Sequence, residues 1–134
     1  MTVTKTQVRN HFLKIKDHLD EVVYSLIRTQ DHDMADEMFL RIRENEATFA
    51  QMARLYSEGP EARTGGVVGP VPLPSAHPLI TEKLRSTPVG RVIKPFWVKQ
   101  YSVILRVEDL IQARLEDHEE GILEFLEGRA ASPS

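Results

Sequence analysis

The sequence predicts an α+β fold in which helices and short strands share a single core. Apolar residues recur at helical spacing in residues 49–56, whereas residues 22–27 and 102–107 are rich in the β-branched and aromatic side chains that are typical of strands. A chain of 134 residues is long enough for one domain with one core and too short for two.

The N-terminal part of the chain predicts a helix, a strand and a second helix. Residues 4–17 begin with a capping box at Thr4 and Gln7 and continue with an apolar stripe, so we expect a helix there. The strand follows at residues 22–27. The acidic residues 31–36 then lead into apolar residues at helical spacing, and carboxylates are favourable at the positive end of a helix dipole. We interpret this acidic cluster as a helix start and not as a cation site, since it lacks the spacing of a calcium loop.

A third helix is expected at residues 49–56. Thr48 and Gln51 form a second capping box at its start. The Gly-Pro pair at residues 59–60 predicts its end, because proline lacks the amide needed to continue a helix and glycine can take the left-handed conformation. The double glycine at residues 65–66 then predicts a chain reversal.

The next part of the chain predicts a connector, a short helix and a hairpin. Alternate prolines at residues 70–74 favour an extended, non-helical connector, and residues 78–84 suit a short helix with proline in its first turn. Residues 92–98 are expected to pair with residues 102–107 across a tight turn. Pro95 in the first of these strands requires an edge position or a bulge.

The two ends of the chain predict one helix each. Leu115, Ile122 and Phe125 give apolar spacing near the C-terminus, before the sequence GRAASPS at residues 128–134, which we expect to be disordered. Each terminal helix has a single apolar face. We therefore expect the two helices to pack on each other or on the rest of the domain.

The stretch from Phe49 to Gly69 carries a further pattern, F-x-x-x-A-x-x-Y-S-x-x-P-x-A-x-x-G-G-x-x-G. Downstream segments continue the series in order, at residues 87–90, 92–96 and 103–108. This ordered series resembles the parvulin-type (PpiC, rotamase) family of peptidyl-prolyl cis-trans isomerases. It divides the chain into an N-terminal flanking helix at residues 1–20, a parvulin-like rotamase domain at residues 21–111, and a C-terminal helix and tail at residues 112–134.

The resemblance implies both a fold and a function. The implied fold is a four-stranded, mostly antiparallel sheet surrounded by helices, with one flanking helix at each terminus. The implied function is isomerisation of X-Pro bonds without any cofactor, so the expected partners are proline-containing peptides or unfolded protein. Some chaperone-type members of the family have helices on both sides of the rotamase domain, and the arrangement here is similar to a shortened version of that.

The resemblance also assigns a substrate pocket by position. Val68, Ala76 and Ile80 correspond to its lining, with Val98 near its rim. Ala76 is smaller than the side chain that the family prefers, so we expect a shallower pocket. His77 lies beside these residues in the sequence, and it is expected either to supply a polar group to the pocket or to be a histidine of a surface turn.

Three positions of the family's inner polar network carry other side chains in this chain. The two strand histidines correspond to Ser25 and Val103, and the cysteine or aspartate between them corresponds to Gly59. Ser25 can still donate and accept a hydrogen bond, but valine and glycine have no polar side-chain atom. We therefore expect an isomerase of weak or altered activity.

Composition excludes several classes of function. The net charge is −3, from 17 basic and 20 acidic residues, so no basic field indicates binding to nucleic acid or an anionic membrane. The chain has no cysteine, which excludes a disulfide scaffold, a zinc-thiolate site and a cysteine nucleophile, and we expect no metal. The N-terminus lacks the apolar core of a secretory signal, and no apolar run is long enough to span a bilayer, so the expected location is cytoplasmic.

Three functional hypotheses follow from these observations. The first is a weak or altered parvulin-type isomerase. The second is a non-catalytic peptide-binding or chaperone-like module that keeps the pocket but not the rate enhancement. The third is a structural assembly domain that binds a protein partner through its terminal helices, which an exposed apolar patch on those helices would favour.

Overall fold

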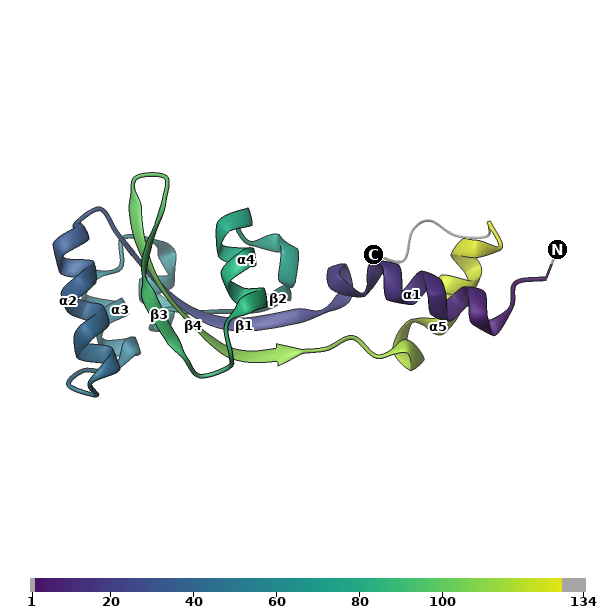
Figure 1. Cartoon of the computed structure of the whole chain (residues 1–134), viewed down its shortest axis with the longest axis horizontal. Coiled ribbons are helices and arrows are strands. Elements are labelled where there is room, and N and C mark those ends of the chain that lie inside the picture. Colours follow the sequence, from purple (N-terminus) through teal and green to yellow (C-terminus); the bar gives the residue numbers. More distant parts are fainter. Residues whose placement is uncertain (1, 129–134) are drawn as a thin grey trace.

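A computed structural model describes residues 2–128, in which a four-stranded sheet forms the centre of the molecule (Figure 1). The spatial order of its strands is β2-β1-β4-β3, and every pairing is antiparallel. This confirms the expected α+β class and the expected sheet. The strands are β1 (Glu21–Thr29), β2 (Val67–Pro72), β3 (Val92–Val98) and β4 (Tyr101–Ile111).

The helices lie around this sheet and at its ends. Figure 1 shows an elongated molecule, with α2 and α3 toward one end and α1 and α5 at the other. No helix within residues 2–128 is long and apolar enough to cross a membrane. The helices are α1 (Lys5–Leu19), α2 (His32–Arg43), α3 (Phe49–Tyr56), α4 (Pro78–Ser86) and α5 (Leu115–Leu126), with short 3-10 helices η1 (Pro60–Thr64) and η2 (Leu73–Ser75).

The sheet has a separate apolar core on each face. Successive side chains of a strand point to opposite faces. On β1, Tyr24 and Leu26 join the core beneath α4, whereas Ile27 joins the core beneath α2 and α3. On β4, Val103 and Ile104 divide in the same way. The central parts of β1 and β4 are therefore buried on both faces, which explains their consecutive apolar residues, such as Leu26–Ile27 and Val103–Leu105.

The terminal helices form a third core of their own. Val8 and Phe12 of α1 pack with Ile122 of α5, and all three are buried. This confirms the expectation that the two helices pack on each other. The pair is also tied to the sheet, because the Asp20 carboxylate after α1 accepts a hydrogen bond of 2.7 Å from the backbone amide of Ala113 before α5.

The predicted helix starts are confirmed at atomic level. Thr4 with Gln7 and Thr48 with Gln51 each make both hydrogen bonds of a capping box. The acidic cluster begins α2 as expected, since the Asp31 carboxylate caps the helix by accepting from a backbone amide. The disorder expected for the C-terminal tail concerns residues that lie almost entirely outside the described range.

The prediction that a left-handed Gly59 ends the third helix is wrong. Gly59 is extended, with φ −106° and ψ 178°, and α3 already ends at Tyr56. The helix stops earlier because Ser57 turns into extended backbone and its hydroxyl accepts a hydrogen bond of 3.1 Å from the Arg28 amide. The left-handed residue is Gly65 (φ 63°), which begins the predicted chain reversal.

The proline-rich connector is extended as expected as far as Pro72, where it is a paired strand, but the non-helical expectation is wrong for residues 73–75, which form the 3-10 helix η2. Strand β2 pairs with β1 at the edge of the sheet, and η2 follows it. Prolines fit there because an edge strand can leave its outer donors unpaired. Gly69 (φ 107°) is needed within this strand, since a Cβ at that position would collide with the carbonyl oxygen of Val22.

The C-terminal hairpin has the predicted form. Strands β3 and β4 pair around a turn at Lys99 and Gln100, and β3 is an edge strand. The register shifts between Ile93 and Phe96, so Pro95 lies at a bulge as well as at an edge. Helix α4 also begins at its predicted proline, Pro78.

The loop after α3 is fastened to the end of β1 by Glu58. Its Oε2 accepts hydrogen bonds from the Thr29 hydroxyl (2.6 Å) and from the Gln30 amide (2.7 Å). The bond from Thr29, followed by that from the Gln30 amide, lowers the pKa of Glu58 below its ordinary value of 4.5. A depressed folded-state pKa stabilises the fold above the unfolded-state pKa, and this contribution is lost as the pH falls through the folded value.

We expect Glu58→Gln to reduce the free energy of unfolding at pH 7 and to have progressively less effect below pH 4.5. Urea unfolding of both proteins at a series of pH values measures this difference. Glu82→Gln, at an exposed position of α4, is the matched control and should show little effect at any pH. A constant difference between wild type and Glu58→Gln from pH 7 to pH 3 would contradict the assignment.

Candidate functional site

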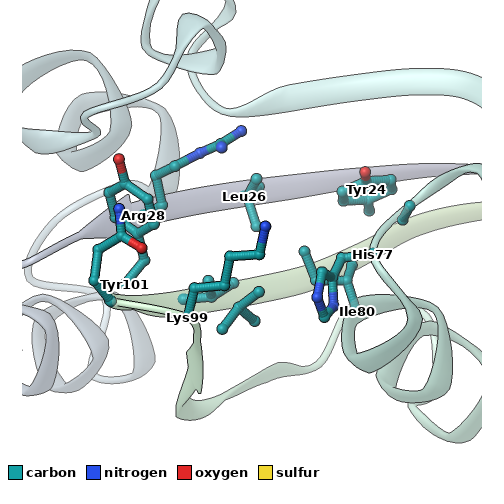
Figure 2. A pocket seen from close by; sticks show the side chains of 11 residues that line it. Tyr24, Leu26, Arg28, His77, Ile80, Lys99 and Tyr101 are labelled. Atoms are coloured by element: carbon teal, nitrogen blue, oxygen red, sulfur yellow. The ribbon is translucent and has the colours of Figure 1, made fainter.

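A cavity of about 460 Å³ opens on the face of the sheet that carries α4 (Figure 2). It is bounded by β1, by the β3–β4 hairpin and by the segment that leads into α4. Its volume lies within the usual range for sites that bind small molecules. The lining residues are Tyr24, Leu26, Arg28, Ala76, His77, Ile80, Val98, Lys99, Gln100, Tyr101 and Val103.

The base of the cavity is apolar because it is part of the core beneath α4. Leu26, Ile80, Val98 and Val103 belong to that core and are each at most 8% exposed. Ala76 packs against the same core and is partly exposed. The cavity therefore offers an apolar surface that can cover an apolar ring.

The rim of the cavity is polar and carries only basic charge. Arg28 from β1 and Lys99 from the hairpin turn both line the cavity (Figure 2), and none of the eleven lining residues is acidic. His77 caps α4, since its Nδ1 accepts a hydrogen bond of 3.1 Å from the Leu79 amide. In the neutral ring the proton is then on Nε2.

The structure brings five of the eight predicted site residues together. Ala76, His77, Ile80, Val98 and Val103 all line the cavity. The position of His77 combines the two alternatives left by the sequence, because it caps a surface turn and also lines the cavity.

Val68, Ser25 and Gly59 are absent from the lining. Val68 lies on β2 opposite Tyr24 and packs against the core from the side. Ser25 lies on the other face of the sheet, where its hydroxyl donates a hydrogen bond of 2.9 Å to Glu108. Ser25 is absent from the lining because successive side chains of a strand point to opposite faces, so Tyr24 points toward the cavity and Ser25 points away from it.

Sequence reasoning missed a set of polar lining residues. Tyr24 and Arg28 lie four residues apart on the same face of β1, Lys99 lies in the hairpin turn, and Tyr101 is the first residue of β4. The sequence shows that every second residue from Tyr24 to Arg28 shares one face of the strand. It does not show which face borders the cavity, because both faces of β1 are packed against helices.

Behind the rim lies an ion pair that connects Arg28 to η1. The Arg28 Nε donates a hydrogen bond of 2.5 Å to Oε1 of Glu61, a side chain only 2% exposed. The guanidinium group also lies 6.0 Å from the centroid of the Tyr101 ring, a cation–π contact at the edge of the usual range. Residues 2–128 contain no cluster of three or more histidine, aspartate or glutamate side chains that could hold a metal ion.

The Tyr24 side chain is 6% exposed and lies close to this ion pair. Burial raises the pKa of its hydroxyl, Arg28 acts in the opposite direction, and Glu61 raises the pKa further. The hydroxyl therefore remains protonated at neutral pH and can donate a hydrogen bond.

Comparison with known proteins identifies a matching family. Residues 7–109 match the sequence model of the Rotamase family, described as the PPIC-type PPIASE domain. Among curated protein sequences no significant match is found.

The fold is similar to several solved structures. PrsA, a peptidylprolyl isomerase of Bacillus anthracis, has a TM-score of 0.66 at 20% identity, over 94% of this chain and 56% of its own length. A SurA-like chaperone of Campylobacter jejuni has a TM-score of 0.66 at 16% identity, over 96% and 56% of the two chains. A PpiC-type isomerase domain has a TM-score of 0.63 at 19% identity, over 73% and 97%. This chain thus spans just over half the length of the first two proteins, and the likeness is one of fold.

We expect Tyr24→Phe to remove a tyrosinate step that lies above pH 10.0 in a titration followed by absorbance at 295 nm. A raised folded-state pKa stabilises the fold below the unfolded-state value, and this contribution is lost as the pH rises through the folded value. The wild type should therefore lose stability more steeply than Tyr24→Phe in alkaline solution. Tyr56→Phe removes a more exposed ring and should leave that step in place. If the step that Tyr24→Phe removes lies at or below pH 10.0, the described surroundings of Tyr24 are wrong.

Proposed function

Since residues 7–109 place the chain in the PpiC-type peptidyl-prolyl cis-trans isomerase family, we propose that it binds X-Pro segments of peptides or unfolded proteins in this cavity and isomerises them weakly. The observation that carries the proposal is the cavity itself, an apolar base bordered by side-chain donors. The base would cover the proline ring, and the donors would hold the flanking peptide groups.

The chemistry needs no covalent step and no cofactor. The barrier to rotation is about 18–20 kcal/mol and arises from resonance in the amide. A site lowers it by binding the twisted amide more tightly than the planar one. Donors that line the cavity can do this by stabilising the carbonyl oxygen as it rotates out of conjugation, and Tyr24, Arg28 and Lys99 are the side chains proposed for that role.

Low activity is proposed because the inner positions are largely apolar. Val103 presents only a hydrocarbon surface to the cavity, and Ser25 and Gly59 contribute no side chain to it. Of the remaining donors, Arg28 and Lys99 lie at the rim, where water competes for the same hydrogen bonds. A donor that is partly solvated stabilises a transition state less than one in a dry site.

A binding module without rate enhancement is the second candidate. The apolar Val103 on the cavity base favours it, because binding needs only a covered proline ring and not a polar network. The similarity to a SurA-like chaperone is consistent with such a role. An assembly domain is less favoured, since α1 and α5 bury their apolar stripes against each other.

We expect wild-type protein, in catalytic amount, to produce cis–trans exchange cross-peaks in NMR spectra of short X-Pro peptides, with chemical-shift changes at the cavity residues. Ala76→Trp would fill the cavity and should weaken peptide binding by about tenfold or more, the factor that corresponds to about 1.4 kcal/mol. Leu79→Trp introduces the same side chain at an exposed position of α4 outside the cavity lining and should behave as wild type.

The outcomes separate the candidates. Chemical-shift changes at the cavity residues without cis–trans exchange cross-peaks would show a binding module and not an isomerase. Equal binding by wild type and Ala76→Trp would show that the cavity is not the peptide site. The absence of both signals with wild type would refute the proposed function.

A further inference from the structure

Glu61 is a buried carboxylate beside the cavity that the proposed chemistry leaves unused. It lies in η1, and the residue is only 5% exposed. Its Oε1 accepts the hydrogen bond from Arg28, whereas its buried Oε2 has no hydrogen-bond partner among residues 2–128. An unpartnered carboxylate oxygen in the interior is costly, so its retention requires an explanation.

The neighbouring Gly59 explains where this carboxylate fits. A Cβ added at Gly59 would overlap both carboxylate oxygens of Glu61 and would lie 2.5 Å from the Arg28 Nε. The Glu61 carboxylate therefore fills the volume that a side chain at position 59 would occupy. The backbone of Gly59 is extended and suits any residue, so the Glu61 and Arg28 side chains are what exclude a larger residue there.

We propose that Glu61 supplies, from two residues downstream, the polar group missing at position 59, and that it acts as a positioning residue for Arg28. This inference rests on the proposed function. Arg28 is the side chain that links the ion pair to the cavity, with 35% of its side chain exposed. Because Glu61 holds the Nε, the Arg28 side chain has fewer orientations, and its terminal nitrogens remain available as donors to a bound peptide carbonyl.

The same ion pair determines which substrates the site accepts. The carboxylate of Glu61 offsets the charge of Arg28, so Arg28 presents hydrogen-bond donors with little net charge to the peptide. Arg28 then contributes little to the basic charge of the rim, which is left mainly to Lys99. Removing the negative charge of Glu61 would expose the full charge of Arg28 and shift the preference toward an acidic residue before proline.

Three variants test the proposal. Glu61→Ala removes the carboxylate and should lower kcat/KM by about tenfold or more, because Arg28 is no longer held in position to donate to the transition state. Gly59→Asp/Glu61→Ala returns a carboxylate to the same volume and, with a small shift of the Arg28 side chain away from the new Cβ, should recover most of that loss. Glu61→Gln keeps the shape but not the charge, and should raise the ratio of kcat/KM for Glu-Pro over Ala-Pro peptides severalfold.

The 15N–1H signal of the Arg28 Nε provides a readout that does not depend on activity. A protected signal is expected in wild type and in Gly59→Asp/Glu61→Ala, and loss of protection is expected in Glu61→Ala. If wild type neither binds nor isomerises X-Pro peptides, the proposed function fails, and with it the role of Glu61, even where the Nε signal shows that the ion pair exists.

Other outcomes overturn the inference while the proposed function stands. In an active wild type, unchanged kcat/KM in Glu61→Ala would show that Glu61 does not position Arg28. Folded Gly59→Asp/Glu61→Ala protein with a protected Nε signal but no recovered activity would show that the two positions are not equivalent. An unchanged Glu-Pro to Ala-Pro ratio in Glu61→Gln would remove the role in substrate selection.

Discussion

The double pairing of β1 is the constraint on which the rest of the structure depends. This strand has β2 on one side and β4 on the other, and it is covered by helices on both faces. Whether a side chain of β1 faces one core or the other is therefore decided by whether its residue number is even or odd. A slip of one residue would bury Arg28 beneath α3 and turn Ile27 toward the cavity, so the register is strongly specified.

The polar groups of the interior follow the same division. On the cavity face, Arg28 is matched by Glu61 from η1. On the opposite face, Glu108 accepts from both Ser25 and Arg106. Each face thus has its own ion pair, and neither depends on the other across the sheet. This separation lets the cavity face differ in its polar residues without disturbing the packing of α2 and α3.

Local signals in the sequence predicted most of the fold but only part of the site. Capping boxes, apolar spacing and Pro78 placed the helices, because these signals act within a few residues. The end of α3 was misjudged, because the Ser57 hydroxyl that stops it bonds to a residue 29 positions away. The assignment of Ser25 rested on a resemblance whose register can shift by one residue, and a shift of one reverses the face of a strand. Glu61 left no local signal, since its relation to Gly59 appears only in three dimensions.

The packing of α1 on α5 has a mechanical consequence. These helices continue from the start of β1 and the end of β4, which are paired at Glu21 and Ile111. A force that separated the two helices would therefore break the hydrogen bonds between β1 and β4 one after another from that end. It would not load many of these bonds at the same time, as a shearing force along the strands would. The helical core therefore keeps β1 and β4 together at that end, and the hairpin at the far end, with Lys99 and Tyr101 of the cavity lining, would be the last part to separate.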